Sequence, residues 1–188
     1  MKSFPASRFV ASYHPVLRAI HWLMAALIFL ALGFGVSTTQ LPREGIRSDV
    51  LFVHKSIGVA LLTLIALRIV VRLAVGAPPY AAPLGRFVQA AANANHLALY
   101  ALMLALPVTG YLMSEAGAHD VSFFGLFSLP DLVLKDKTLE ETARLAHYLF
   151  ACAIGAALAL HLAAVFWHAR VKRDAVLTRM WPRWTPTA

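Results

Sequence analysis

The stretch His147–His161, HYLFACAIGAALALH, places a histidine at each end of an apolar run that has no charged side chain. The two histidines are fourteen residues apart, a rotation about 40° short of four full α-helical turns. On a helix both imidazoles therefore face one side, about 21 Å apart along the axis. That distance covers most of a hydrocarbon core, which is about 30 Å thick. The stretch predicts a membrane-spanning helix with two histidines at different depths.

The composition of the whole chain also indicates a membrane protein. Of its 188 residues, 60% are hydrophobic and 14% are charged, with a mean hydropathy of +0.67. Soluble domains are usually about 45–50% apolar and about 25% charged. The net charge of +8 would favour nucleic acid as a partner of a soluble protein. Here basic residues that flank spanning helices explain it better, so we expect a lipid bilayer and no nucleic acid.

The cysteine content excludes several redox cofactors. Cys152 is the only cysteine in the sequence, so the chain forms no intrachain disulfide. It has no CxxCH motif, which excludes covalent attachment of a c-type haem. It also has no cysteine cluster for an iron–sulfur centre or a structural zinc.

Four apolar segments are long enough to cross a membrane, which takes about 20 mostly apolar residues. They cover roughly residues 16–37, 53–74, 94–114 and 143–168. The first follows a basic N-terminus, as a signal peptide would, but no convincing A-x-A cleavage site follows it, so we expect it to be retained. We see no internal repeat. The prediction is an all-α, integral membrane four-helix bundle that forms a single transmembrane domain over residues 1–188.

The connecting segments define the orientation of this bundle. With the N-terminus in the cytoplasm, eleven Lys and Arg residues flank the inner side and six flank the outer side. The positive-inside rule then places both termini in the cytoplasm and the long 115–142 loop in the periplasm. The aromatic stretch of that loop, VSFFGLFSLPDL, suits the lipid–water boundary. The basic cytoplasmic tail, 169–188, carries Trp181 and Trp184, which suit an interfacial anchor.

The histidines fall at two depths in this topology. His54 lies near the outer end of its segment, at the level of His147. His21 lies near the inner end of its segment, at the level of His161. Imidazole is an axial ligand of haem iron, and helix bundles build cofactor sites from inward-facing side chains. Two b-type haems, an outer and an inner one, would use all four histidines as metal ligands.

A zinc or copper transport path is the chemical alternative for these histidines. Such a path would more often bring Asp, Glu, Cys or Met side chains close to them, and the helical segments offer almost none. A proton transporter could use the same histidines. A visible spectrum separates these possibilities, because bis-histidine haem b has a sharp reduced band.

Arg68 follows His54 by fourteen residues, so it shares that face at the inner level. A buried arginine needs an anionic partner, and haem carries two propionates. We therefore expect Arg68 to pair with a propionate of the inner haem. Arg18 and Arg72 are alternatives or simply positive-inside anchors. Small residues, including Gly33, Gly35 and Gly58, leave room for a flat macrocycle or serve ordinary helix packing.

Several motifs resemble the bacterial cytochrome b561 family. They are RAIHWLMAALI, HKSIGVALLTLIALRIVVRL, HLALYALMLALPVTGYLM, FFGLFSLP and LTRMWP. Together with His147 and His161 of the fourth segment, they span roughly residues 12–184. The resemblance implies a four-helix protein of the bacterial inner membrane that carries two haems b. It implies the ligands His21, His54, His147 and His161.

One branch of that family is a superoxide oxidase, which takes an electron from superoxide on the outer side and passes it to ubiquinone. Other members are membrane cytochrome subunits of hydrogenases and other dehydrogenases, and those chains tend to be longer. The resemblance therefore implies superoxide:ubiquinone oxidoreductase activity for this short chain. A cytochrome b subunit that links a periplasmic dehydrogenase to the quinone pool is the alternative.

Quinone reduction takes up protons, and histidine suits proton transfer near neutral pH. His168 follows His161 by seven residues and lies on the same face at the inner boundary. His96 begins the third segment at the inner level, within the family-like HLALY motif. We expect a quinone site near His168, with His96 as a further candidate. His168, beside Trp167, is alternatively an ordinary interfacial residue.

Positive charge near the outer haem would guide a small anion such as superoxide. Lys55 is next to His54, and Arg144 lies one turn before His147. Arg43 and Arg47 lie in the first outer loop. The acidic residues of the 115–142 loop work against anion collection and would instead suit a basic protein partner. The superoxide hypothesis therefore depends on whether the fold keeps the basic side chains at the outer haem.

Overall fold

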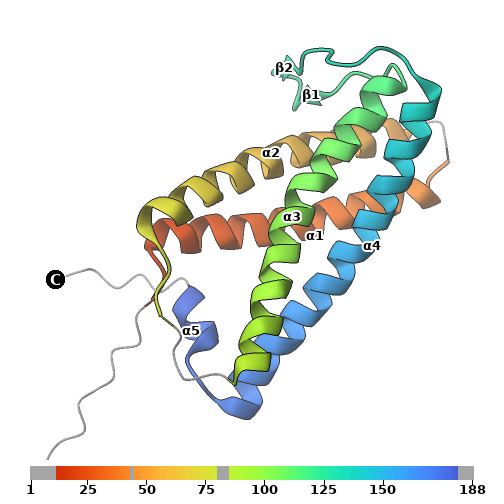
Figure 1. Ribbon diagram of the computed structural model, residues 1–188. Coiled ribbons are helices and arrows are strands. Elements are labelled where there is room, and N and C mark those ends of the chain that lie inside the picture. The colour runs from red at the N-terminus through yellow and green to blue at the C-terminus, as the bar shows by residue number, and fades with distance from the viewer. Residues whose placement is uncertain (1–11, 43–44, 80–84, 182–188) are drawn as a thin grey trace, which may run out of the picture.

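The computed structural model describes residues 12–42, 45–79 and 85–181. Its main elements are four long helices, each long and apolar enough to cross a membrane. They are α1 (Pro15–Gln40), α2 (Ile46–Val75), α3 (Arg86–Ala116) and α4 (Lys137–Trp167) (Figure 1). The predicted all-α fold with four spanning helices is confirmed.

Four small elements complete the described chain. Two short strands, β1 (Ser122–Phe123) and β2 (Phe127–Ser128), lie between α3 and α4 and pair with each other in antiparallel fashion. A π-helical turn, η1 (His168–Lys172), and a short helix, α5 (Val176–Met180), follow α4. We call the end of the bundle that carries α5 the inner end, and the end that carries β1 and β2 the outer end.

The long helices extend beyond their apolar runs. α2 begins seven residues before residue 53, and α3 begins eight residues before residue 94. Polar residues such as Arg and Gln are good helix formers, so a helix continues past the lipid-facing part that hydropathy detects. α4 begins where the Asp136 side chain accepts a hydrogen bond from Leu139 N, which caps its first turn.

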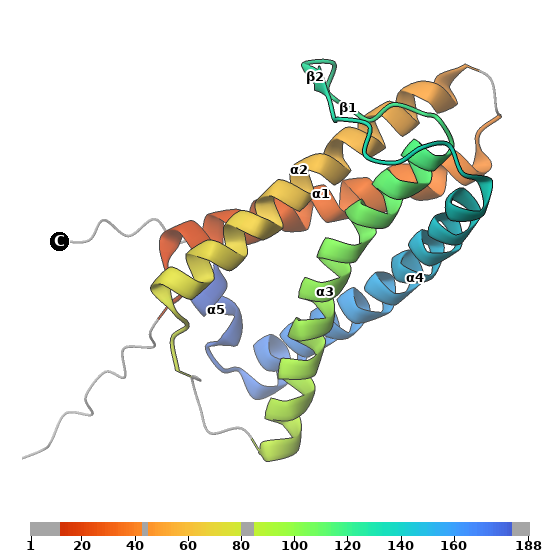
Figure 2. The same cartoon turned by 45° about the horizontal axis from the view of Figure 1, so that its top comes forward.

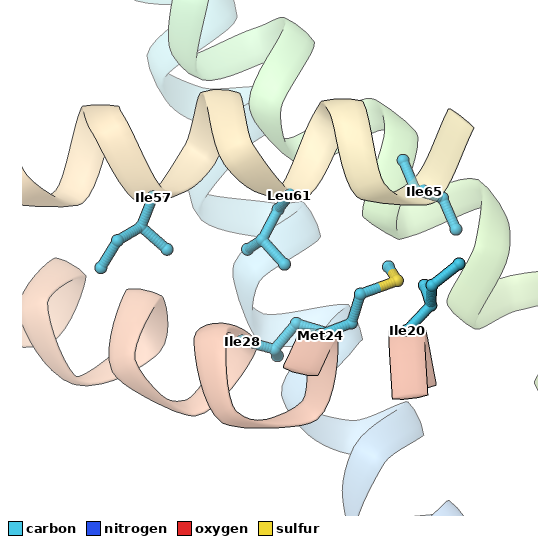
Figure 3. Packing of buried hydrophobic residues seen from close by; sticks show 6 residues of the cluster. All are labelled: Ile20, Met24, Ile28, Ile57, Leu61 and Ile65. Atoms are coloured by element: carbon cyan, nitrogen blue, oxygen red, sulfur yellow. The ribbon is translucent and has the colours of Figure 1, made fainter. Parts of the chain in front are cut away.

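The helices form two antiparallel pairs, α1–α2 and α3–α4, which meet where α2 packs against α3. The two pairs diverge toward the inner end, and α5 lies between them there (Figure 2). Large buried side chains at four-residue spacing form the seam of the first pair (Figure 3). These residues are Ile20, Met24 and Ile28 of α1 and Ile57, Leu61 and Ile65 of α2.

The tail after α4 folds back onto the start of α1. Trp22 Nε1 donates a hydrogen bond to the Met180 carbonyl oxygen at 2.8 Å, and Arg18 donates one to the Trp181 carbonyl oxygen at 3.2 Å. The Trp181 ring packs edge-on against Trp22, with ring centres 5.5 Å apart. The tail is therefore a folded cap on the inner end rather than an extended anchor. Trp184 lies outside the described residues.

Candidate functional site

The fold brings the four predicted histidines together as two pairs. His54 of α2 faces His147 of α4, with ring centres 6.2 Å apart and ring planes at 84°. His21 of α1 faces His161 of α4, with ring centres 6.4 Å apart and planes at 69°. We call these the outer pair and the inner pair. α4 contributes one histidine to each, because its fourteen-residue spacing keeps both rings on one face.

The outer imidazoles are oriented by backbone carbonyl groups of neighbouring helices. His54 Nδ1 lies 2.9 Å from the Ala31 carbonyl oxygen, and His147 Nδ1 lies 3.0 Å from the Leu106 carbonyl oxygen. A carbonyl oxygen only accepts, so each Nδ1 carries the proton and donates it. Each Nε2 is then an unprotonated nitrogen, which is the form that binds a metal.

Each outer imidazole also packs against a glycine. A Cβ atom on Gly35 would lie 3.1 Å from His54 Cε1, and one on Gly110 would lie 3.1 Å from His147 Cε1. Glycine therefore lets each ring lie close to the adjacent helix. Gly35 was expected either to make room for a macrocycle or to serve helix packing, and in the structure it makes room for the His54 imidazole. A Cβ on Gly33 or Gly58 would meet nothing within 4 Å.

These contacts reveal an internal repeat that the sequence analysis missed. Gly35 lies four residues after Ala31, and Gly110 lies four residues after Leu106. The pair α1–α2 has fourteen-residue steps from His21 to Gly35 and from His54 to Arg68. The pair α3–α4 has the same steps, from His96 to Gly110 and from His147 to His161. The two His–Gly steps of the repeat are visible in the sequence, whereas the shared hydrogen bonding is visible only in the fold.

Two further polar residues lie at the inner pair. The His96 ring centre is 5.6 Å from that of His161. Arg68 is only 8% exposed, and its charge lies near the inner imidazoles. It donates hydrogen bonds to Tyr100 Oη at 3.0 Å and to the Leu17 carbonyl oxygen at 3.2 Å.

The partners of Arg68 are both neutral. Among the described residues, no carboxylate forms an ion pair with it, so its buried charge has room for an anionic partner. The two alternatives are engaged elsewhere at the inner end. Arg72 contacts the Gly76 carbonyl oxygen and the Tyr13 ring, and Arg18 binds the Trp181 carbonyl oxygen.

The geometry of both pairs fits a haem held by two histidines. A ligand nitrogen lies about 2 Å from its metal, and the ring centre lies roughly 1 Å behind it, so two opposed ligands have ring centres about 6 Å apart. A cavity of about 400 Å³, lined mainly by apolar side chains of α2, α3 and the 121–132 segment, borders both outer imidazoles. Such a cavity suits a flat apolar macrocycle.

A bare metal ion fits these residues less well. In the described ranges, no group of three or more His, Cys, Asp or Glu side chains could hold a metal ion. Protein zinc sites use three or four such ligands. The arrangement of two imidazoles in each site therefore matches a metal whose remaining ligands come from a macrocycle.

The structure brings Lys55 to the outer pair but directs Arg144 elsewhere. Lys55 lines the outer cavity, and its Nζ donates a hydrogen bond to the Asp120 carbonyl oxygen at 3.0 Å. The Arg144 side chain is 59% exposed and forms an ion pair with Glu140, one turn earlier on α4. Arg47 does not line the cavity, and Arg43 lies outside the described residues.

His168 pairs with an acidic residue of the tail. Its Nδ1 lies 2.5 Å from Asp174 Oδ2, because the chain turns back at Arg173, which has a positive φ of 51°. The histidine that joins the inner pair is His96 rather than His168. The structure therefore separates the two candidates for a quinone site into different surroundings.

Comparison with known proteins agrees with this architecture. Residues 12–183 match the family described as prokaryotic cytochrome b561. Cytochrome b561 homolog 2 of Escherichia coli is 30% identical over 171 residues, which is 89% of this chain and 90% of the relative. The probable superoxide oxidase CybB of Yersinia pestis is 27% identical over 164 residues, which is 87% of this chain and 92% of the relative.

A third relative, cytochrome b561 homolog 1 of Escherichia coli, is 28% identical over 182 residues, covering 87% of this chain and 93% of its own. These matches extend over almost the whole chain and include all four spanning helices. They make the chain a bacterial multi-pass membrane protein and confirm the resemblance read from its motifs. The chain belongs to the prokaryotic cytochrome b561 family, whose members transfer electrons in membranes with b-type haem.

Proposed function

We propose that this chain is a superoxide:ubiquinone oxidoreductase of the bacterial inner membrane, with two haems b. The observation that carries the proposal is the presence of two imidazole pairs at two levels of one apolar bundle, one pair toward each end. A single chain with both sites can connect a donor on one side of the membrane to an acceptor near the other. The positive-inside rule places the outer pair toward the periplasm.

In this proposal His54 and His147 hold the outer haem, and His21 and His161 hold the inner haem. The bound haems supply the one-electron chemistry. With two histidine ligands each, the bound haems would have no open position for oxygen. Arg68 would neutralise an inner propionate, since it is buried and no carboxylate of the described residues forms an ion pair with it.

The balanced reaction oxidises two superoxide anions to two O₂ and reduces one ubiquinone with two electrons and two protons. The protein must therefore deliver protons only where the quinone binds. The His168–Asp174 pair at the inner end can donate and recover a proton through the imidazole. We propose it as the proton-handling group of the quinone site, with His96 as the second candidate.

Superoxide as the donor is supported by one residue of the outer cavity and by one relative. Lys55 lines the cavity beside the outer pair, where its ammonium group would attract an anion. The relative named probable superoxide oxidase covers most of this chain. Arg144 contributes less to this guidance than the sequence predicts, because its charge is paired with Glu140.

A cytochrome b subunit of a larger dehydrogenase complex is the second candidate. Two acidic residues favour it, because they lie close enough to Lys55 to offset its charge. Glu115 and Asp120 both act electrostatically on Lys55. Such a surface would suit a basic donor protein better than a small anion.

The test measures reduction of the haems by superoxide in the purified protein reconstituted in liposomes. Superoxide should reduce the haems rapidly, and Lys55→Met should slow this reduction severalfold. Arg144→Met is the matched control and should have little effect. If superoxide does not reduce the haems, the donor is not superoxide. If Lys55→Met leaves the rate unchanged, Lys55 does not guide the anion. If the purified protein shows no reduced b-type spectrum with about two haems per chain, the proposed electron-transfer function is refuted.

A further inference from the structure

The segment 121–130, VSFFGLFSLP, has no charged residue and is bounded by Asp120 and Asp131. We call it the outer hairpin. Its strands pair with Ser122 opposite Ser128 and Phe123 opposite Phe127. The tight turn between them has positive φ at Phe124 (48°) and Gly125 (73°). An uncharged hairpin with exposed apolar side chains has the composition of a surface that contacts a membrane rather than of a water-exposed loop.

The outer hairpin lies beside the outer part of α2 and projects from the side of the bundle (Figures 1 and 2). Ser56 of α2, which is fully buried, contacts its backbone. Phe123 and Phe127 border a groove together with Thr63 of α2. Thr63 lies nine residues inward of His54, which is about 14 Å along a helix. Ser56 lies two residues inward of His54, so the hairpin contacts α2 just inward of the outer histidine pair, and its aromatic rings border a groove that extends further inward.

Several backbone groups of the outer hairpin are paired, which lowers the cost of contact with lipid. The Ser56 hydroxyl accepts a hydrogen bond from Phe124 N at 3.0 Å and lies 3.1 Å from the Ser122 carbonyl oxygen. Leu126 N donates to the Phe123 carbonyl oxygen at 2.9 Å, and Leu129 N donates to that of Val121 at 2.8 Å. Unpaired backbone groups are costly in lipid, and these bonds pair the turn and both ends of the hairpin.

The two sides of the outer hairpin have opposite surroundings. Val121, Leu129 and Pro130 line the cavity that borders the outer histidine pair. The tip faces away from the protein, with Phe124 46%, Leu126 77% and Phe127 56% exposed. Three adjacent large apolar side chains at this depth would meet acyl chains. Lys55, whose Nζ binds the Asp120 carbonyl oxygen, marks the polar boundary above them.

We propose that the outer hairpin is a membrane-contacting element whose apolar tip meets lipid acyl chains of the leaflet at the outer end. Ser56 is the positioning residue that holds it against α2. Its inward side closes the outer cavity toward the bilayer. This proposal rests on the membrane location of the helices and holds whichever molecule donates electrons.

The test measures the surroundings of the tip directly. A nitroxide label on Leu126→Cys, in a Cys152→Ser background, is reconstituted in phosphatidylcholine–phosphatidylglycerol liposomes. Collision with dissolved oxygen, which concentrates in lipid, is compared with collision with a water-soluble nickel chelate. The label at residue 126 should collide mainly with oxygen, as a label on the lipid-facing Leu160→Cys should. A label on the exposed Lys137→Cys should collide mainly with nickel.

A nickel-accessible label at residue 126 would overturn the proposal, because the tip would then lie in water. A label that is inaccessible to both reagents would also overturn it, because protein would then cover the tip. Ser56→Ala removes the acceptor of Phe124 N and should shift the label toward nickel accessibility. Ser37→Ala, which removes a serine bonded to its own helix at Gly33, is the matched control and should cause no shift. Lipid exposure that Ser56→Ala leaves unchanged would refute the positioning role of Ser56.

Discussion

Gly110 of α3 lies against the imidazole of His147, so close that a Cβ atom on residue 110 would stand 3.1 Å from Cε1 of that ring. The same ring donates its Nδ1 proton to the Leu106 carbonyl oxygen, one turn earlier on α3. The neighbouring helix thus determines both the position of the ring and the nitrogen that remains free. Disturbing one of these contacts should disturb the other.

Gly110→Ala should weaken haem binding at the outer site. The added methyl group displaces the His147 ring and lengthens its hydrogen bond, and loss of such outer-shell support lowers metal affinity about 10–100-fold. The measurement is haem content per chain, read from the reduced spectrum of the purified variant. Gly33→Ala is the control, because a Cβ there meets nothing within 4 Å. Equal haem content in both variants would contradict the packing argument.

Alanine at any one of the four paired histidines should remove one haem. Each substitution leaves a site with a single imidazole, so the haem content should fall to about half and the remaining haem should keep its bis-histidine spectrum. Quantitative haem extraction and low-temperature electron paramagnetic resonance would show this. His119→Ala, which removes the histidine of the outer loop, should retain full haem content. Full retention in all four variants would exclude the proposed ligands.

The outer haem should have the lower midpoint potential. His54 and His147 each donate an Nδ1 proton to a carbonyl oxygen, which makes them more electron-donating ligands and favours the oxidised metal. Among the described residues, neither His21 nor His161 has a hydrogen-bond partner at Nδ1, and the charge of Arg68 lies near both. A positive charge favours the reduced metal, so the inner potential is raised.

Arg68→Met should therefore lower one of the two midpoint potentials, by an amount on the order of tens of millivolts. A spectroelectrochemical titration measures both midpoints. His147→Met identifies the outer haem, because methionine ligation raises the potential of the haem to which it binds. Arg72→Met, which removes an arginine bonded to Gly76, is the control and should shift neither midpoint strongly. A shift of the outer midpoint potential by Arg68→Met would contradict the placement of Arg68 at the inner haem.

His168→Asn and Asp174→Asn should each slow quinone reduction by about 10²-fold, which is within the range of a lost proton-transfer group. Haem content and reduction of the haems by the donor should not change, since neither residue belongs to the imidazole pairs. Stopped-flow reoxidation of reduced protein by a soluble ubiquinone analogue provides the rate. His96→Asn tests the second candidate in the same assay. If only His96→Asn slows reoxidation, the quinone site lies at the inner pair instead.

The membrane-spanning architecture could be predicted because it depends on local composition. An apolar run of sufficient length identifies a spanning helix, and a fourteen-residue spacing identifies a shared face, as for His147 and His161. The true helix starts could not be predicted in this way, since polar residues continue the helix outside the lipid. Arg144 shows another limit, because proximity in sequence to His147 did not reveal its ion pair with Glu140.

The features that sequence reasoning missed depend on contacts between distant segments. The carbonyl partners of the outer histidines carry no side-chain signal, so only the fold reveals them. The cap formed by α5 depends on bonds from Trp22 and Arg18 to backbone oxygens more than 150 residues away. Gly110 could have been found from the sequence, because it follows His96 by the same number of residues as Gly35 follows His21.

The repeated fourteen-residue spacing is the pattern expected from joining two copies of one helical hairpin end to end. In such a duplication His54 and His147 are the same ancestral position, so the outer site is built from two identical halves. The inner site is not, because it joins His21 of one copy to a different position, His161, of the other. In the duplication His96 corresponds to His21, and Arg68 corresponds to His161, so a second inner site would pair His96 with residue 68. Because residue 68 is an arginine, only one of the two inner sites that the symmetry allows has two histidines.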